Sequence, residues 1–352
     1  MLLFRVAEGL AFGRPATDSA ISGKRCQFQR IKIRKMREAV SCFLRDFSPW
    51  RSFFFAVIYW HWRFYLIEIM FIGGSGLYEL ENLEQIEEVN IPTPFGETSD
   101  SIITGSVAGV KVGFMPRHGK KHTLLPNEIP YRANIYAIKT LGANRIVSVS
   151  AVGSLRENIG PMDIVIPDQL IDRTASSSRG NTFFGDGIVA HVSFADPYCS
   201  DLRRIIRTCC QELGANFHYG GDLVVIEGPQ FSSRSESNLY RSWGADIIGM
   251  TALPEAKLAR EAEMCYSTLA MVTDYDCWRS EKEEVSADLV IRNLKKNSLI
   301  SKSLITLLCK NINTDEIFCA CRKSLEKALI TKLSFESAST KKIQPIIGKY
   351  IE

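Results

Sequence analysis

A mostly apolar run of strand length, Tyr266 to Val272, constrains the fold more than any other stretch of the chain. Such a run, bounded by polar residues, is typical of a strand buried on both faces of an α/β sheet. It is followed by Thr273, Asp274, Tyr275 and Asp276, and open α/β sheets keep their binding sites at such strand ends. If the chain stays extended there, the two aspartates point to the same side.

Two interpretations of Asp274 and Asp276 are open at this point. Paired carboxyl groups beside a buried strand suit the protonation of a leaving group, because burial and like charge raise one pKa. Alternatively, both acids cap the next helix or lie in water, which is the more common situation for aspartate. The residues that follow the other predicted strands help to distinguish these two interpretations.

Composition bounds the class of protein. The 352 residues, 45% of them hydrophobic, suffice for one large α/β domain or two ordinary ones. The net charge of +4 comes largely from the first third of the chain and is too small for a nucleic-acid surface. None of the ten cysteines has a standard zinc spacing, including Cys319-Ala-Cys321. We therefore predict a reducing, cytoplasmic location and mostly free thiols.

The first 66 residues differ from the rest in being basic and then aromatic. The run Phe53 to Phe71 is a candidate membrane span, but it contains three ionisable side chains, namely His61, Arg63 and Glu68. These make insertion costly, so no membrane anchor is predicted. We predict that residues 1–66 are a poorly ordered or non-native extension, and that residues 67–352 form one domain including C-terminal helices.

Strand and helix patterns alternate beyond this extension, which favours an α/β fold. The expected strands are residues 67–72, 110–115, 145–150, 163–167, 223–227, 245–251 and 266–272. The expected helices are residues 127–141 and 202–213, one reaching Trp243 and one beginning near Pro254. The Ser- and Gly-rich residues 175–187 are expected to form a loop.

Groups suited to an anion follow three of these strands. Gly73-Gly74-Ser75-Gly76 is a tight turn whose backbone can approach an anion, with the Ser75 hydroxyl as a further donor. A dinucleotide fingerprint would need glycine where this chain has Glu79. Arg117 and His118 suit phosphate, although a basic surface turn is an equally good explanation. Ser150 and Ala151 can present a hydroxyl and a backbone N–H.

Apolar and ring-bearing residues follow the other strands. Phe231 stands among turn-forming polar residues after strand 223–227 and is suited to stacking on a flat ring. Met250 and Thr251 end the strand before Pro254. His191 is one of five histidines, and on its own it is more simply explained as a structural residue.

These motifs together resemble one family. In chain order they are G-G-S-G-L, P-F-G, R-H-G-x-x-H, Y-R-A-N-I, S-A-V-G-S-L, E-G-P-Q-F-S-S-R-S-E, W-G-A-D-I-I-G-M-T-A-L-P-E and A-x-V-T-D-Y-D-C-W. The series resembles the bacterial-type 5′-methylthioadenosine phosphorylases, the 6-aminopurine branch of the trimeric purine nucleoside phosphorylases, from about residue 67 to the end. The resemblance implies a single-domain nucleoside phosphorylase fold, with a mixed, partly barrel-like central sheet flanked by helices.

The resemblance also assigns roles to individual residues. It implies a phosphate site made of Ser75, Arg117, His118, Ser150, Ala151 and Thr251. It implies a nucleoside site made of Phe231 against the purine, Met250 against the ribose, Asp274 and Asp276 at N7 and the exocyclic amine, and His191 from a neighbouring subunit. A helix beginning between Val285 and Val290 would cover the 5′ substituent. Asp274 would be the catalytic acid, its pKa raised by burial and by Asp276.

The implied reaction is phosphorolysis of S-methyl-5′-thioadenosine to adenine and 5-methylthioribose 1-phosphate, a pentosyl transfer in purine and methionine salvage. The resemblance implies a homotrimer that uses phosphate as co-substrate, with no cofactor, metal, nucleic acid or membrane partner. Alternatives are a 6-oxopurine or methylthioinosine phosphorylase, which usually has Asn at the position of Asp274, and a hydrolytic nucleosidase. A nucleotide-binding protein without enzymatic activity is the alternative from a different class.

Overall fold

A computed structural model of the chain describes residues 67–74, 76–77, 79–175, 179–279, 287–312 and 319–351. The predictions made for residues 1–66 lie outside these described residues. Within the described part, no helix is both long enough and apolar enough to cross a membrane.

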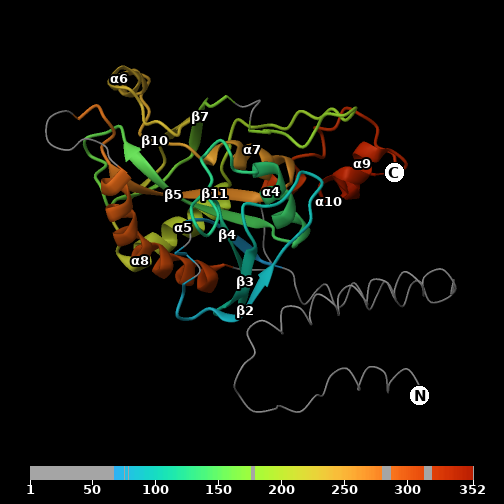
Figure 1. The fold of residues 1–352 in the computed structure, drawn as a ribbon, viewed down its shortest axis with the longest axis horizontal. Coiled ribbons are helices and arrows are strands. Elements are labelled where there is room, and N and C mark those ends of the chain that lie inside the picture. Colours follow the sequence, from blue (N-terminus) through green and yellow to red (C-terminus); the bar gives the residue numbers. More distant parts are fainter. Residues whose placement is uncertain are drawn as a thin grey trace, which may run out of the picture. The chain divides into compact units, whose positions relative to one another are not determined.

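A mixed sheet forms the centre of the fold (Figure 1). Its strands are β1 (Ile69–Gly73), β2 (Glu84–Val89), β3 (Ile102–Val107), β4 (Val110–Pro116), β5 (Arg145–Ser154), β6 (Ile164–Ile166), β7 (Gln169–Arg173), β8 (Phe217–Tyr219), β9 (Asp222–Ile226), β10 (Ile247–Gly249) and β11 (Cys265–Asp274). The main order is β2-β3-β4-β1-β5-β10-β9-β7, and β11 leads from β5 to β6 and β8. The predicted mixed α/β architecture is therefore confirmed.

The long strand β5 is the branch point of this sheet. It pairs in parallel with β1 and with β11, and its last residues pair antiparallel with β10. One strand thus joins the part of the sheet built from β1 and β4 to the part built from β9 and β10.

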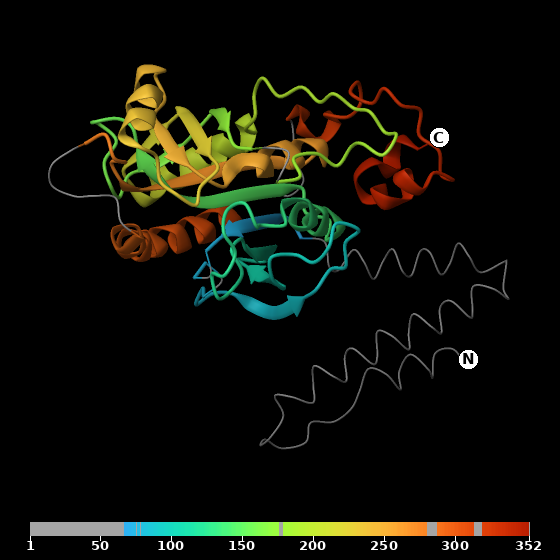
Figure 2. The same cartoon turned by 45° about the horizontal axis from the view of Figure 1, so that its top comes forward.

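Helices cover both faces of the sheet (Figure 2). They are α4 (Tyr131–Thr140), α5 (Ser200–Leu213), α6 (Arg234–Ser242), α7 (Ala252–Glu261), α8 (Ala287–Asn311), α9 (Ala338–Lys342) and α10 (Gln344–Ile347), with short 3₁₀ turns η2 (Ala320–Lys323) and η3 (Gly348–Tyr350). Helices α4 and α7 share one apolar cluster, and α5 and α8 share another on the opposite side. Each cluster buries one face of the sheet.

Strand β11 is buried along its whole length, as its apolar sequence predicts. Tyr266 and Ala270 belong to the cluster beneath α4 and α7, whereas Leu269 and Met271 belong to the cluster beneath α5 and α8. This alternation follows from the two-residue period of a strand. Apolar burial on both faces fixes the register of β11, and thereby the position of the acidic residues at its end.

The predicted strands and helices are confirmed, with changes at their ends. Strand β5 continues to Ser154 instead of ending at Ser150, and α7 begins at Ala252, ahead of Pro254. Gly214, the C-cap of α5, has the left-handed backbone that favours glycine, with φ of 67°. Strands β2, β3, β7 and β8 were not predicted.

Candidate active site

The carboxyl ends of β1, β4, β5 and β11 gather a group of buried polar side chains, because these strands run parallel. Arg117 comes directly after β4 and is 3% exposed. Its Nε donates to Glu255 Oε1 at 2.6 Å and its Nη2 donates to Glu255 Oε2 at 3.1 Å. Arg117 is therefore held in a bidentate ion pair with Glu255, instead of forming the alternative basic surface turn.

Three hydroxyl groups extend this ion pair along the strand ends. Arg117 Nη2 donates to Ser148 Oγ at 2.6 Å, Ser148 Oγ lies 3.3 Å from Ser150 Oγ, and Ser150 Oγ lies 3.5 Å from Thr251 Oγ1. The four side chains come from the end of β4, from β5 and from the start of α7. A positive charge and neighbouring hydroxyl donors in a buried row are suited to an oxyanion with several oxygens.

His118, the next residue after Arg117, is held by a hydrogen bond from one of its two ring nitrogens. Its Nδ1 lies 2.8 Å from the carbonyl oxygen of Leu124, which can only accept, so Nδ1 carries the proton. Burial lowers the pKa of His118 to about 4, and the neighbouring Arg117 charge acts in the same direction. The imidazole is therefore neutral at pH 7 and offers Nε2 as an acceptor.

The two acids lie together at the end of β11, but not on an extended chain. Val272 pairs with Val152 and Asp274 pairs with Gly153, so Thr273 is an extra residue in a β-bulge. Asp276 then adopts a positive φ of 51°. The expectation of an extended chain was wrong, and the bulge and turn together bring the two side chains inward.

Gly153 allows this close approach. A Cβ at that position would lie 3.0 Å from Asp274 Oδ1 and 3.3 Å from Asp276 Cβ. Both aspartates are buried, being 6% and 5% exposed respectively. The solvated interpretation of the two acids is therefore wrong.

Hydrogen bonds distinguish the two carboxyl groups. Asp274 Oδ1 accepts from the backbone N–H of Asp276 at 2.8 Å, and Asp274 Oδ2 accepts from Thr273 Oγ1 at 2.8 Å. Among the described residues, buried Asp276 Oδ2 has no hydrogen-bond partner. A buried acceptor of this kind suits an N–H donor from a ligand.

Burial raises the pKa of Asp274, while its hydrogen bonds from Thr273 and from the Asp276 backbone act in the opposite direction. Burial also raises the pKa of Asp276, to which the Asp274 charge adds. The like-charge interaction between the two carboxyl groups, expected from the sequence, raises the pKa of Asp276. Burial is thus the cause that favours a protonated Asp274.

Two of the predicted nucleoside-binding residues lie on the loops that follow β10 and β9. Met250 follows β10, and a Cβ on Gly228 would lie 2.6 Å from Met250 Sδ, so these two chain segments are in close contact. Phe231 is 45% exposed on the loop after β9, as its surroundings in the sequence indicate. An exposed aromatic ring there is available for stacking.

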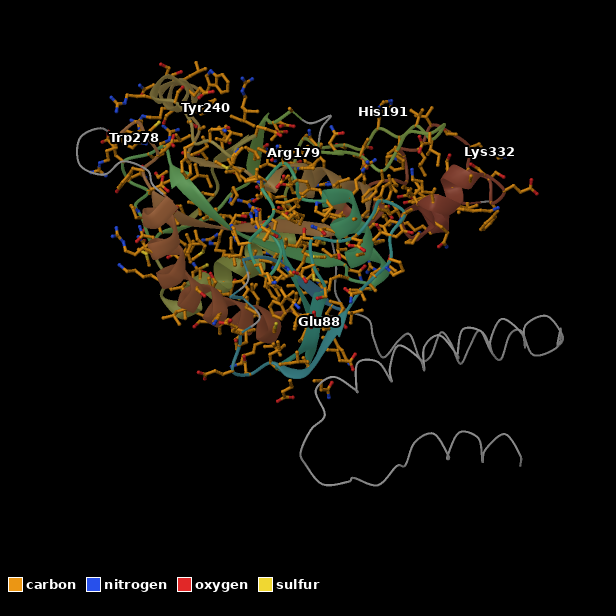
Figure 3. The ribbon with its side chains drawn as sticks, viewed as in Figure 1. Glu88, Arg179, His191, Tyr240, Trp278 and Lys332 are labelled. Atoms are coloured by element: carbon orange, nitrogen blue, oxygen red, sulfur yellow. The ribbon has the colours of Figure 1, made fainter. Side chains whose placement is uncertain are left out.

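His191 lies elsewhere in the fold. It is exposed, its backbone N–H donates to Ala328 O at 2.9 Å, and Figure 3 places it far from Trp278, which follows the acids in the chain. His191 therefore cannot complete the site of its own chain.

Several predicted residues are not described by the structure. Ser75 and Val285 lie outside the described residues, and Val290 falls within α8 with its side chain undescribed. The predicted helix after Val285 does form as α8. Asn293 Nδ2 donates to Thr273 O at 2.7 Å and Asn297 Nδ2 donates to Val272 O at 3.3 Å, so α8 is tied to the end of β11.

The sequence interpretation missed two buried charged residues that support the site. Glu255 lies in the first turn of α7, is 2% exposed and pairs with Arg117. Arg179 is 4% exposed and donates to Met250 O at 2.7 Å and to Leu253 O at 3.0 Å. No spacing pattern signals either residue, because their partners are distant in sequence.

Comparison with known proteins identifies relatives over most of the chain. Residues 68–308 match the phosphorylase superfamily. The chain is 52% identical over 281 residues to S-methyl-5′-thioadenosine phosphorylase of Geobacter sulfurreducens, covering 80% of this chain and 98% of that protein.

Solved structures agree with this relationship. A methylthioadenosine phosphorylase from an Antarctic soil metagenomic library has a TM-score of 0.76 and 48% identity, with 80% of this chain and 99% of that one covered. The Schistosoma mansoni methylthioadenosine phosphorylase in complex with adenine has a TM-score of 0.71 and 33% identity, with 75% and 99% covered.

Proposed function

The chain belongs to the phosphorylase superfamily, and from this membership we propose that it is a pentosyltransferase acting on S-methyl-5′-thioadenosine. The reaction uses inorganic phosphate and releases adenine and 5-methylthioribose 1-phosphate. Relatives of about half-identical sequence carry the corresponding name over nearly their full length.

The observation that carries this proposal is the arrangement of polar groups along β5. Ser148 and Ser150 join the row that begins at Arg117, whereas Gly153 adjoins the two buried acids. Gly153 lies three positions after Ser150, which is about 10 Å along a strand. A nucleoside bound between them has its anomeric carbon toward the phosphate row and its base toward the acids.

The buried row formed by Arg117, Ser148, Ser150 and Thr251 binds phosphate and orients it as the nucleophile. Arg117 is kept charged because the attraction of Glu255 more than offsets the burial that by itself lowers its pKa. Since neutral His118 offers an acceptor, a phosphate facing it brings its own proton to that contact. A phosphate oxygen then attacks C1′ from the side opposite the base.

The acids handle the leaving base. As the C1′–N9 bond breaks, its electron pair moves to the purine and negative charge develops there. Asp274, whose pKa is raised by burial, is the group that donates a proton to N7, while the unpartnered Oδ2 of Asp276 accepts from the 6-amino group. Preorganised groups of both kinds stabilise the charge-separated transition state. None of these steps requires a metal or an organic cofactor.

Product release distinguishes the proposed reaction from its alternatives. Adenine formation from S-methyl-5′-thioadenosine is to be measured with and without phosphate, beside adenosine and inosine. We expect release that depends on phosphate and fails with inosine. Release without phosphate would indicate a nucleosidase, inosine turnover a 6-oxopurine enzyme, and binding without release a non-enzymatic protein.

A homotrimer accounts for the position of His191, which lies far from Trp278 of its own chain (Figure 3). In the trimer, His191 reaches the 5′ substituent in a neighbouring subunit. The eight cysteines of the described residues form no disulfide, which suits a reducing cytoplasm. Sedimentation analysis tests the trimer, and a monomer with full activity would contradict it.

A further inference from the structure

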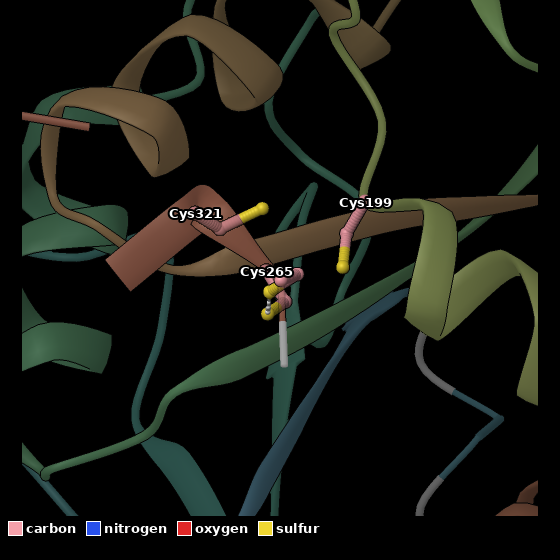
Figure 4. Close-up of side chains that lie close together, drawn as sticks. Cys199, Cys265 and Cys321 are labelled. Atoms are coloured by element: carbon pink, nitrogen blue, oxygen red, sulfur yellow. Dashed lines mark hydrogen bonds between the residues drawn. The ribbon is translucent and has the colours of Figure 1, made fainter. Parts of the chain in front are cut away.

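Four cysteines from three separate parts of the chain meet at the other end of β11. Cys199 caps the start of α5, Cys265 is the first residue of β11, and Cys319 and Cys321 lie at the start of η2. Their four Sγ atoms all lie within 4.8 Å of one another. Figure 4 shows the three labelled side chains directed into one small space between these segments.

The spacing of the sulfur atoms suits one metal ion. Cys265 Sγ and Cys319 Sγ are 3.2 Å apart, much farther than the roughly 2.05 Å of a disulfide bond. A zinc ion about 2.3 Å from each ligand in a tetrahedron separates its sulfurs by about 3.8 Å. The observed cluster is therefore the size of a mononuclear tetrathiolate centre.

The surroundings can balance the charge of four thiolates. The backbone N–H of Leu202, in the first turn of α5, donates to Cys199 Sγ at 3.5 Å, and the positive end of the helix dipole lies at Cys199. Buried Arg145 lines the same small cavity as Cys199, Cys265 and Cys319.

We propose that Cys199, Cys265, Cys319 and Cys321 bind one zinc ion as a structural tetrathiolate site. Three of the four ligands are buried, as expected for a closed structural centre. The site lies at the opposite end of β11 from Asp274, about 30 Å along a ten-residue strand. It therefore takes no part in the reaction and does not depend on the proposed function.

The ion would add one direct link between three elements of the fold. It links the start of α5 and the start of β11 to η2, which begins the C-terminal segment containing α9 and α10. Cys265 and Cys319 are 54 residues apart, so the link closes a long loop. Closing such a loop restricts the unfolded chain, as other covalent and metal crosslinks do.

Metal analysis of the full-length protein, purified with a reductant and without added chelator, tests this site. We expect about one zinc per chain, falling to nearly none in Cys321→Ser. Cys209→Ser is the matched control, because Cys209 is also a buried free cysteine but lies outside the cluster. The control should retain its zinc.

A second measurement does not depend on the folding of any variant. Wild-type protein stripped of zinc and titrated with cobalt(II) should develop the strong visible absorption of a tetrahedral cobalt thiolate, saturating at one ion per chain. Zinc-free protein that gives no such absorption would overturn the proposal. So would a mass lowered by two hydrogens per pair, which would show that the cysteines form disulfides instead.

Discussion

Replacing Asp274 by Asn removes a transferable proton from the candidate active site while preserving its hydrogen bonds. The amide oxygen can keep the contact with the Asp276 N–H, now 2.8 Å from Oδ1. The amide nitrogen then faces Thr273 Oγ1, which can accept because its own hydrogen can turn to Val152 O at 3.2 Å. No buried group loses its partner, so the fold should be retained.

The expected loss of activity follows from what the proton does. A positioned general acid contributes about 10²- to 10⁴-fold, or about 3 to 5 kcal/mol of transition-state stabilisation. Because the proton moves only as the C1′–N9 bond breaks, kcat and kcat/KM should fall together. Stability should not fall, because burial already disfavours the ionised form of Asp274.

The assay is phosphate-dependent adenine release, with thermal unfolding measured on the same samples. Wild-type kcat/KM should decline with rising pH as Asp274 loses its proton, and Asp274→Asn should lack that decline. Unchanged turnover in a folded variant would refute the role of Asp274 as proton donor. A rise in KM alone would show that Asp274 only binds the base.

Three further substitutions examine the supporting structure. Gly153→Ala places a Cβ within 3.0 Å of Asp274 Oδ1, so kcat/KM for the nucleoside should fall about tenfold or more while KM for phosphate is retained. Glu255→Gln leaves buried Arg117 without its counter-charge and should cost about 3 to 5 kcal/mol of unfolding free energy, with phosphate raising Tm more than in wild type. Burial raises the pKa of Glu261 from 4.5 to about 7, so the folded state binds this proton more tightly. The contribution of Glu261 to the free energy of unfolding should be largest below pH 4.5, and about 3 kcal/mol of it should be lost as the pH rises to about 7. Glu261→Gln should remove this dependence of the unfolding free energy on pH.

Each of these predictions has an outcome that contradicts it. Full activity of Gly153→Ala would show that the acids can move without cost. If phosphate raises Tm equally in Glu255→Gln and in wild type, Arg117 does not bind phosphate. An unchanged pH slope in Glu261→Gln would place the titrating group elsewhere.

The sequence predicts most of the strands that carry the site, because they are apolar runs followed by polar residues. Strands β2 and β8 do not show this pattern. The sequence of β2 is Glu-Gln-Ile-Glu-Glu-Val and the strand is largely exposed, whereas β8 has only three residues. Their pairing is decided by neighbours that are distant in sequence. Local periodicity therefore finds the centre of the sheet better than its edges.

The candidate site is predictable where one residue type suffices for the chemistry and not where geometry decides. Arg117 and the two aspartates stand out as residue types at strand ends. Their contacts and backbone conformation could not be predicted. The ion pair of Arg117 with Glu255 joins residues 138 apart, and the chain turns at Asp276 where an extended chain was expected. The four-cysteine cluster likewise has no sequence spacing, since α5, β11 and η2 meet only in the folded chain.

The bulge at Thr273 makes the positions of Asp274, Asp276 and Gly153 depend on one another. Without the extra residue, the alternation of the strand would turn Asp274 away from Gly153. Residues 272–276 and Gly153 must therefore change together when one such enzyme is redesigned to accept another base, whereas the row from Arg117 to Thr251 can stay as it is. An alignment that slides a gap across the bulge would compare residues from opposite faces of β11.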